Sequence, residues 1–408
     1  MTDNAPTATG PRRVVLVLGA LIALGPLTID AYLPALPAIA DDLDATDALV
    51  QLTLTGTLAG LAVGQLVVGP LSDALGRRRP MIAGIGVHVI ASLLCVVAPS
   101  VAILGVLRAV QGFGAAAAMV IAMAVVRDLY VGSAAATVLS RLILVMGVAP
   151  ILAPSLGGLI LLRGSWRGIF VMLAVFGVAL IFVAVFALRE TLPRYRRRPV
   201  GVGFALRGYL RLVRDPIFVA LAVAGGLAMS TLFAYIAGAS FVLQDDFGLD
   251  EQQFALVFGV GAVALIAASQ VNVVVLRRYA LTAVVGVALA AALGAAVLLG
   301  VFAMTGAGGV WGFVVPVWLV LAASGFVLPN APALALSRHG EAAGTAAALV
   351  GAAQFGIGAL VAPLVGVLGN DSIAMATVMV AGPAVALVAL GGAGLASRRQ
   401  VPTPVAVG

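Results

Sequence analysis

Residues 69–80 read GPLSDALGRRRP and form a short charged segment between two long apolar stretches. The rest of the chain largely avoids charge, since 10% of its 408 residues are charged and 62% are hydrophobic. A soluble protein of this length needs a more polar surface. The segment is therefore typical of a polar turn between two membrane spans, and the composition predicts that lipid is the main solvent of this protein.

Apolar stretches long enough to cross a bilayer recur along the sequence. A helical span needs about 20 mainly apolar residues, and we count twelve such stretches. They cover residues 14–36, 48–70, 80–98, 101–124, 135–161, 167–188, 216–242, 253–275, 280–304, 311–335, 344–368 and 373–396. This pattern predicts an all-α integral membrane protein with twelve transmembrane helices.

An arginine-rich segment divides the twelve spans into two sets of six. We therefore predict an N-terminal half at residues 1–188, a cytoplasmic linker at 189–215 and a C-terminal half at 216–408. Within the linker, residues 206–214 interleave leucines and a valine with arginines. This interleaving fits either a helix lying on the inner membrane surface or a solvated, irregular linker.

The arginines predict how the chain is oriented in the membrane. All 23 basic residues are arginine, and 20 of them lie on one side if the N-terminus is cytoplasmic. The positive-inside rule then places both termini in the cytoplasm. The net charge of +7 is accordingly a signal of topology, and we expect no nucleic-acid partner.

The sequence offers little to an enzyme or a metal site. His88 and His339 are isolated, and the lone Cys95 excludes an intramolecular disulfide. We find no nucleophile and base pair and no cluster of metal ligands. We therefore expect neither catalytic activity nor a bound metal.

Asp30 and Arg108 are ionisable residues inside predicted spans. Asp30 lies roughly 24 Å from the inner end of the first span, and Arg108 lies roughly 10 Å from the outer end of the fourth, at 1.5 Å rise per residue. Because such residues usually face a bundle interior or a water-filled cavity, we hypothesise that both line one cavity. Asp30 is then a candidate proton-coupling carboxylate, and Arg108 a candidate for the cavity or proton path.

Each of these two residues also has a purely structural interpretation. Asp30 would then be an interfacial residue that caps the turn before Pro34 and Pro37. Arg108 would be a buried arginine bonded to backbone carbonyls, where it fixes helix packing.

The turn between the second and third spans is a candidate gate. Gly69 and Gly76 allow close helix approach and a tight loop, while Asp73 is placed to accept bonds from a helix end or an arginine. Contacts of this kind hold one conformation closed. The alternative is a plain positive-inside anchor, which explains Arg77 and Arg78 but neither Asp73 nor the glycines.

The fifth span carries a cluster of helix-bending and small residues. Gly147, Pro150, Pro154, Gly157 and Gly158 fall mostly three or four residues apart, so they share one side of a helix. Proline bends a helix and glycine permits close packing. The cluster is either a hinge or seal between the halves, or a kinked packing helix.

Other polar residues in or near the spans give weaker signals. Arg127 and Asp128, at the inner end of the fourth span, form either a pair across a cytoplasmic interface or a solvated pair. Hydrogen bonding between helices is an alternative role for most polar residues inside spans. The candidates for a substrate cavity are Tyr32, Gln111, Tyr235, Asn272, Asn330 and Gln354.

Together these motifs resemble the major facilitator superfamily, and within it the Bcr/CflA drug exporters among the drug:proton antiporters. The resemblance rests on DAYLPALP at residues 30–37, the turn at 69–80 with its preceding Gly64-Gln65, Arg108 with Gln111-Gly112, Arg127-Asp128, and Ala149-Pro150 with Ala153-Pro154 and Gly157-Gly158. It implies that the turn is the gating loop, that Arg108 belongs to a motif linked to proton transfer, and that the fifth-span cluster is the exporter motif.

The chain departs from the family pattern at three points. Ala74 replaces a basic residue in the gating turn, and Ala153 stands where the broader antiporter motif has glycine. The second half retains only Arg277-Arg278 where a repeated turn is expected. We therefore expect asymmetric gating, with the antiporter motif only partly met.

The resemblance implies a proton-coupled multidrug antiporter of the bacterial inner membrane that works by alternating access. It would export small amphipathic drugs, such as chloramphenicol-like or bicyclomycin-like compounds, as a monomer in the lipid bilayer. The proton gradient would supply the energy, with no cofactor. The alternative is an exporter or importer of a single small metabolite, because specificity lies in the shape of the pocket. A membrane enzyme or a receptor fits the sequence less well.

Overall fold

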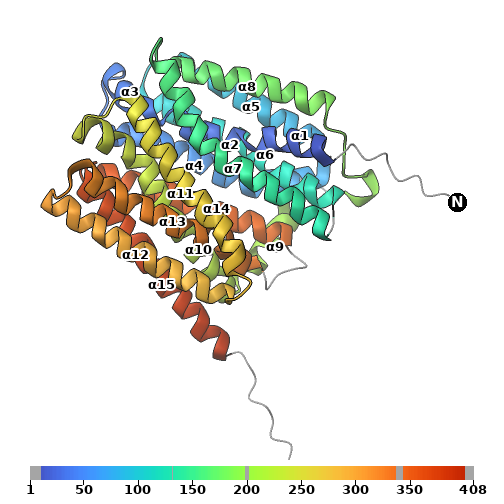
Figure 1. Ribbon diagram of the computed structural model, residues 1–408. Helices are drawn as coiled ribbons and strands as arrows, with labels where there is room; N and C mark the ends of the chain where they lie inside the picture. Colours follow the sequence, from blue (N-terminus) through green and yellow to red (C-terminus); the bar gives the residue numbers. More distant parts are fainter. Residues whose placement is uncertain (1–10, 131, 198–201, 337–342, 400–408) are drawn as a thin grey trace, which may run out of the picture. The chain divides into compact units, whose positions relative to one another are not determined.

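The computed structural model describes residues 11–130, 132–197, 202–336 and 343–399 (Figure 1). All regular secondary structure in these ranges is helical. Twelve of the helical segments are long and apolar enough to cross a membrane. The predicted all-α architecture with twelve spans is confirmed.

The chain forms two compact units. The first comprises Met1–Val200 with Leu249–Val263, and the second comprises Gly201–Gly248 with Ala264–Gly408. The helices of the first unit are α1 (Pro11–Ile22), α2 (Leu24–Asp30), α3 (Leu36–Asp42), α4 (Asp47–Leu75), α5 (Arg78–Val96), α6 (Val101–Leu129), α7 (Gly132–Leu161) and α8 (Arg167–Phe186). Helix α11 (Glu251–Val275) contributes residues to both units.

Small residues let the central helix α6 pack closely on its neighbours. Gly56, Gly60 and Gly64 recur every fourth residue of α4, and a Cβ atom on Gly60 would lie 1.9 Å from the carbonyl oxygen of Ala109 in α6. Helix α5 packs against α6 on another side and against α8, which lies beside it in Figure 1. Backbones approach this closely where neither helix carries a large side chain. This packing fixes the positions of the polar residues on α4, α5 and α6.

The first span is broken, although the apolar pattern predicts one helix at residues 14–36. Helices α1 and α2 are followed by a 3₁₀ turn at Leu33–Ala35 and then by α3, so the span runs on to Asp42. Pro34 and Pro37 explain the break, because proline lacks the N–H that the helical hydrogen-bond ladder needs. Asp30 is therefore the last helical residue before this break.

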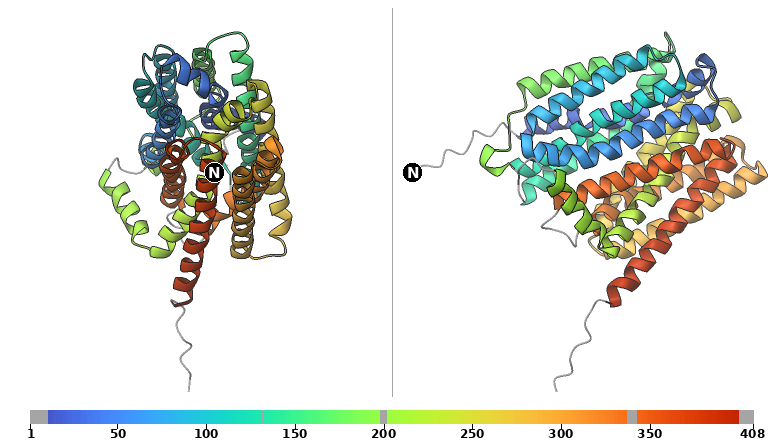
Figure 2. Two further views of the ribbon diagram at one scale, coloured as in Figure 1. Left: turned by 90° about the vertical axis from the view of Figure 1, so that its left-hand side faces the viewer. Right: turned by 180° about the vertical axis from the view of Figure 1, so that it is seen from behind.

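The second unit contains the remaining helices. They are α9 (Val202–Val213), α10 (Pro216–Phe241), α12 (Leu281–Thr305), α13 (Gly309–Leu336), α14 (Ala343–Val367) and α15 (Ser372–Arg399). Helix α10 packs against α14 and α15, and α12 packs against α13 and α15 (Figure 2).

The linker contains the helix α9, whereas the sequence of residues 206–214 fitted either a helix or an irregular segment. In α9, Leu212 is buried against Ile217 and Phe218, the first residues of α10. Leu206 and Leu210 are exposed on the same helix. The position of α9 on the membrane surface stays a prediction.

Candidate functional site

The charged turn between the second and third spans is tighter than its sequence suggests. Helix α4 continues to Leu75 and α5 begins at Arg78, so the turn consists of Gly76 and Arg77. Gly76 has a φ of +93°, a conformation that side chains disfavour. A Cβ atom there would also lie 2.4 Å from Oε2 of Glu190. Gly76 is thus required both by its backbone and by its neighbour.

Arg77 binds three side chains from the ends of two helices. Its Nη1 donates to Oδ1 of Asp73 at 2.5 Å and to Oγ of Ser72 at 2.8 Å, and its Nε donates to Oδ2 of Asp128 at 2.8 Å. Burial alone would lower the pKa of Arg77, but the bonds to Asp128 and Asp73 outweigh it and raise that pKa above its ordinary value. Arg77 stays charged and joins the end of α4 to the end of α6.

Arg78 has different partners from Arg77. Its Nε donates to the carbonyl of Ala184 at 3.4 Å, and its Nη2 donates to the carbonyl of Val185. These carbonyls belong to the last turn of α8, where the helix has unsatisfied acceptors and a partial negative charge. Arg78 therefore caps α8, while Arg127 is exposed beside the Arg77–Asp128 contact. Gly69 lies in α4, and its carbonyl accepts a hydrogen bond at 2.9 Å from the hydroxyl of Ser72, the same hydroxyl to which Arg77 donates.

Glu190 closes the turn from the start of the linker, and no sequence pattern pointed to it. Its carboxylate accepts from the backbone N–H of Arg77 at 2.9 Å, of Leu192 at 3.0 Å and of Arg78 at 3.4 Å. Arg197 lies 3.7 Å away. Partial burial would raise the pKa of the Glu190 carboxyl, but these N–H groups and Arg197 outweigh it and hold that pKa below its usual range. The linker is thereby fastened to the first turn of α5.

Asp30 and Arg108 are both buried in the first unit, but they do not form an ion pair in the part of the chain that the structure describes. Oδ1 of Asp30 has no hydrogen-bond partner among those residues. The Arg108 guanidinium lies 4.1 Å from the ring centre of Tyr32 and 5.6 Å from that of Phe170. These cation–π contacts stabilise the arginine where water is excluded.

Gln111 and Tyr32 surround Arg108 rather than standing apart from it. Nη1 of Arg108 donates to Oε1 of Gln111 at 2.6 Å. The Tyr32 hydroxyl lies 3.2 Å from Oγ1 of Thr53 in α4. Two of the six predicted cavity residues thus belong to one buried polar cluster with Arg108. Their role in binding substrate stays a prediction.

The predicted exporter motif lies on α7, which continues as a helix through Pro150 and Pro154. Pro154, Gly157 and Gly158 are buried, whereas Gly147 is half-buried. A Cβ atom on Gly157 would lie 1.9 Å from the carbonyl oxygen of Ala31. Helix α7 therefore lies against the break in the first span, one residue away from Asp30.

The remaining cavity candidates lie in the second unit. Asn272 of α11 and Asn330 of α13 are buried and donate to each other, at 3.2 Å and 2.7 Å. This pair links two helices in the way that polar residues often do within membranes. Tyr235 is buried in α10, and Gln354 is half-buried in α14.

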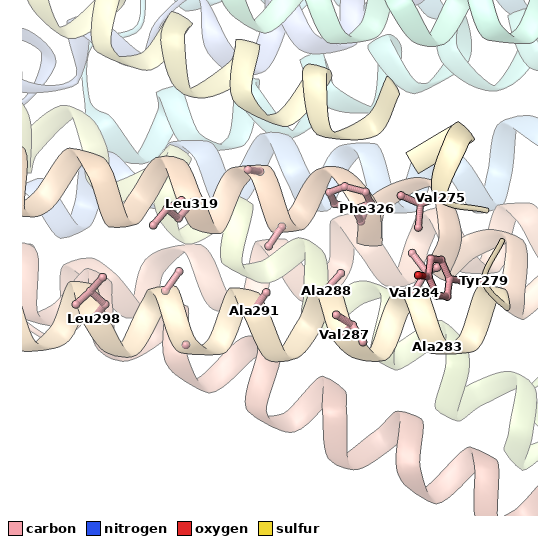
Figure 3. Close-up of a pocket in the computed structure, with 14 residues that line it drawn as sticks. Val275, Tyr279, Ala283, Val284, Val287, Ala288, Ala291, Leu298, Leu319 and Phe326 are labelled. Carbon is pink, nitrogen blue, oxygen red and sulfur yellow. The ribbon is translucent and has the colours of Figure 1, made fainter. Parts of the chain in front are cut away.

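The second unit also contains an apolar pocket of about 660 Å³. It lies between α12 and α13 near the end of α11 (Figure 3). Its lining includes Val287, Leu319 and Phe326, and Val287 is 70% exposed. None of the predicted cavity residues lines this pocket.

The sequence pattern of the Major Facilitator Superfamily matches residues 16–363. The chain belongs to this superfamily. The resemblance seen in its motifs is thereby confirmed, and the chain is a transporter rather than an enzyme. As a superfamily member with twelve apolar helices, it is a multi-pass membrane protein.

Three bacterial relatives illustrate its position in the superfamily. It is 36% identical over 384 residues to a Bacillus subtilis (strain 168) protein named uncharacterized MFS-type transporter YdgK, with 91% of this chain and 93% of the relative covered. It is 31% identical over 360 residues to the bicyclomycin resistance protein homolog of Haemophilus influenzae, covering 88% and 90%. It is 31% identical over 250 residues to multidrug resistance protein MdtL of Escherichia coli O81, covering 61% and 63%.

Solved structures show the same fold at low sequence identity. A bacterial homolog of the human lysosomal transporter Spinster, inward-facing and unoccupied, has a TM-score of 0.73 at 16% identity and covers 97% of this chain and 100% of its own. The xylose transporter XylE from E. coli has a TM-score of 0.71 at 12% identity and covers 97% and 98%.

Proposed function

We propose that this superfamily member is a proton-coupled exporter of small amphipathic drugs. The relatives named for bicyclomycin resistance and multidrug resistance support this choice of substrate class. Chloramphenicol-like and bicyclomycin-like compounds are the first candidates. The transporter would work by alternating access in the bacterial inner membrane, as a monomer with both termini in the cytoplasm.

The observation that carries the proposal is the environment of Asp30. Asp30 is 3% exposed within the first span, and its Oδ1 has no partner among the described residues. A charged carboxylate in such surroundings is costly unless it is paired or protonated. Asp30 is also the last residue of α2, next to Ala31, on whose carbonyl Gly157 packs. A carboxylate at such a break is well placed to exchange its proton when the helices rearrange.

The other candidate residues fit a cycle built on Asp30. Asp30 takes a proton from the outside, and its release toward the cytoplasm favours capture of substrate. Arg108 supplies a fixed positive charge in the same unit, and the contacts of Arg77 with Asp73 and Asp128 hold the inner ends of α4 and α6 together. Breaking and remaking these contacts is the gating step.

Transport by the purified protein in liposomes tests the proposal. We expect an imposed pH gradient to drive uphill movement of chloramphenicol or a cationic dye, and Asp30→Asn to abolish that movement. Asp30→Asn protein that still transports uphill would remove Asp30 from the coupling role. Wild-type transport that ignores the gradient would point to a uniporter or another coupling ion.

A competition panel tests the alternative of a narrow metabolite carrier. A multidrug exporter is inhibited by several chemically unrelated amphipathic compounds. A carrier of a single metabolite responds to none of them, or only to close analogues of one.

A further inference from the structure

A chain of hydrogen bonds begins at Arg108 and ends at the backbone of His88. Nη1 of Arg108 donates to Oε1 of Gln111 at 2.6 Å, and Nε2 of Gln111 donates to Oγ of Ser92 at 2.7 Å. The Ser92 hydroxyl donates to the carbonyl of His88 at 2.7 Å. Arginine has only donors, so it fixes the direction of every bond that follows. The chain thus runs from α6 into α5.

The chain from Arg108 ends on the backbone carbonyl of His88, and the His88 side chain makes a separate contact with the first span. The Thr28 hydroxyl donates its one hydrogen to the carbonyl of Leu24 at 2.6 Å. Its 2.9 Å contact with Nε2 of His88 must therefore be a bond that the imidazole N–H donates to the Thr28 oxygen. This assigns the proton to Nε2 and leaves Nδ1 as the acceptor atom of the ring.

Thr28 belongs to the short helix that ends in Asp30. Helix α2 is the last part of the first span before the break at Leu33–Ala35, and backbone hydrogen bonds from Ala23 to Gly19 and from Leu27 to Ala23 join it to α1. Gly25 of α2 packs on Met119 of α6. Among the described residues, the bond from His88 to Thr28 is the hydrogen bond that ties a side chain of α2 to another helix. It lies two residues before Asp30.

The groups around the imidazole favour a neutral ring that holds one hydrogen bond over a ring that takes up and releases a proton. Arg108 of α6 acts electrostatically on the ring, and α8 presents Gly177, whose Cβ position lies 3.5 Å from Nδ1. Helix α2 contributes Thr28, with Asp30 two residues further along, and α5 itself carries Cys95. A second buried positive charge beside Arg108 is unfavourable, so a neutral ring that donates one bond is the stable arrangement.

We propose that His88 is a positioning residue for proton coupling: it holds the Asp30-bearing helix α2 in register with Arg108. The proposal rests on the proposed function, because it concerns the geometry of the group that carries the proton. It explains why a histidine is buried at a position where the apolar pattern calls for a hydrophobic residue. When α2 moves, the bond between Thr28 and His88 passes the movement to α5, and the bonds of Gln111 to Ser92 and Arg108 join α5 to α6.

Substitutions at both ends of the bond test this role. His88→Leu and Thr28→Val each remove it, and His88→Gln retains an N–H donor. We expect the first two variants to lower gradient-driven transport by about tenfold, a loss on the scale of one buried hydrogen bond, and to shift its pH profile. Substrate counterflow, which needs no net proton movement, should fall by much less. His88→Gln should recover most of the coupled transport.

The double variant and a matched control separate coupling from packing. Thr28→Val combined with His88→Leu should be no worse than either single change, because both remove the same bond. Thr57→Val is the control, since among the described residues the Thr57 hydroxyl bonds only the carbonyl of Thr53 in its own helix. It should leave the pH profile unchanged.

Three results would overturn the role of His88. The first is a wild-type pH profile of transport in both His88→Leu and Thr28→Val. The second is a double variant whose loss of transport equals the sum of the two single losses. The third is a loss of counterflow as large as the loss of gradient-driven transport in every variant, including His88→Gln. If wild-type protein ignores the pH gradient, the proposed function itself fails and the role of His88 falls with it. If wild-type protein responds to the pH gradient and the variants keep normal coupling, the proposed function stands and His88 has no part in it.

Discussion

Arg77 joins three side chains through a guanidinium whose planar shape lysine lacks. It binds Asp73, Ser72 and Asp128 with three of its nitrogen atoms while its side chain is 8% exposed. Lysine keeps the charge but offers a single nitrogen on a flexible stem. Arg77→Lys should therefore lower the free energy of unfolding by about 1.5–3 kcal/mol, the value of a hydrogen bond to a charged group.

Thermal unfolding in detergent measures this effect. Arg79→Lys is the matched control, because Arg79 is exposed in the first turn of α5. Equal unfolding temperatures for the two variants would show that Arg77 contributes only its charge.

Glu190 predicts a specific dependence of stability on pH. Because its bonded carboxylate has a lowered pKa, its contribution to stability is complete above the ordinary glutamate pKa of about 4.3 and is lost as pH falls through the lower folded-state value. Glu190→Gln should be less stable than wild type at neutral pH, and the difference should shrink as the pH is lowered below about 4. A difference in unfolding temperature that stays constant from neutral to acid pH would contradict the role of the ionised Glu190 carboxylate.

At the scale of elements, the contact between α7 and the broken first span is the tightest feature near Asp30. A methyl group on Gly157 would overlap the Ala31 carbonyl, so Gly157→Ala must push α7 away from the break. We expect a loss of about 1–3 kcal/mol in stability, as for overpacking in a core, and a fall in transport. Gly86→Ala in α5 is the control, since nothing lies within 4 Å of the added methyl group. Unchanged transport in Gly157→Ala would mean that the contact is not needed.

The elements also show what sequence patterns predict well and what they miss. Apolar length predicts the spans, because lipid requires every backbone group to bond within its own helix. The turn at residues 69–80 was predicted too long, since polar Ser72 and Asp73 continue α4 by bonding to Arg77. The first span was predicted unbroken, although Pro34 and Pro37 carry the signal for the break.

Partners far apart in the sequence were the least predictable part of the site. Asp73 and Arg77 are four residues apart on one helical face, so their contact follows from local spacing. Glu190 and Arg77 are 113 positions apart, and Thr28 and His88 are 60 apart. His88 looked isolated because its partner is a threonine, a residue that gives no signal of its own within an apolar span.

At the scale of the whole molecule, the proposed function makes drug export depend on proton entry. Twelve spans and superfamily membership make the chain a transporter, and the proposed coupling assigns the proton to Asp30. Movement of drug in one direction must then be accompanied by movement of protons in the other. This exchange distinguishes an antiporter from a uniporter or a symporter.

The most direct test is to follow the pH inside liposomes that contain the protein and are loaded with chloramphenicol. On dilution into drug-free buffer without a pH gradient, wild-type liposomes should become acidic inside as the drug leaves, and Asp30→Asn liposomes should not. Drug efflux through the wild-type protein with no change in internal pH, or the same acidification in Asp30→Asn, would contradict the proposed exchange.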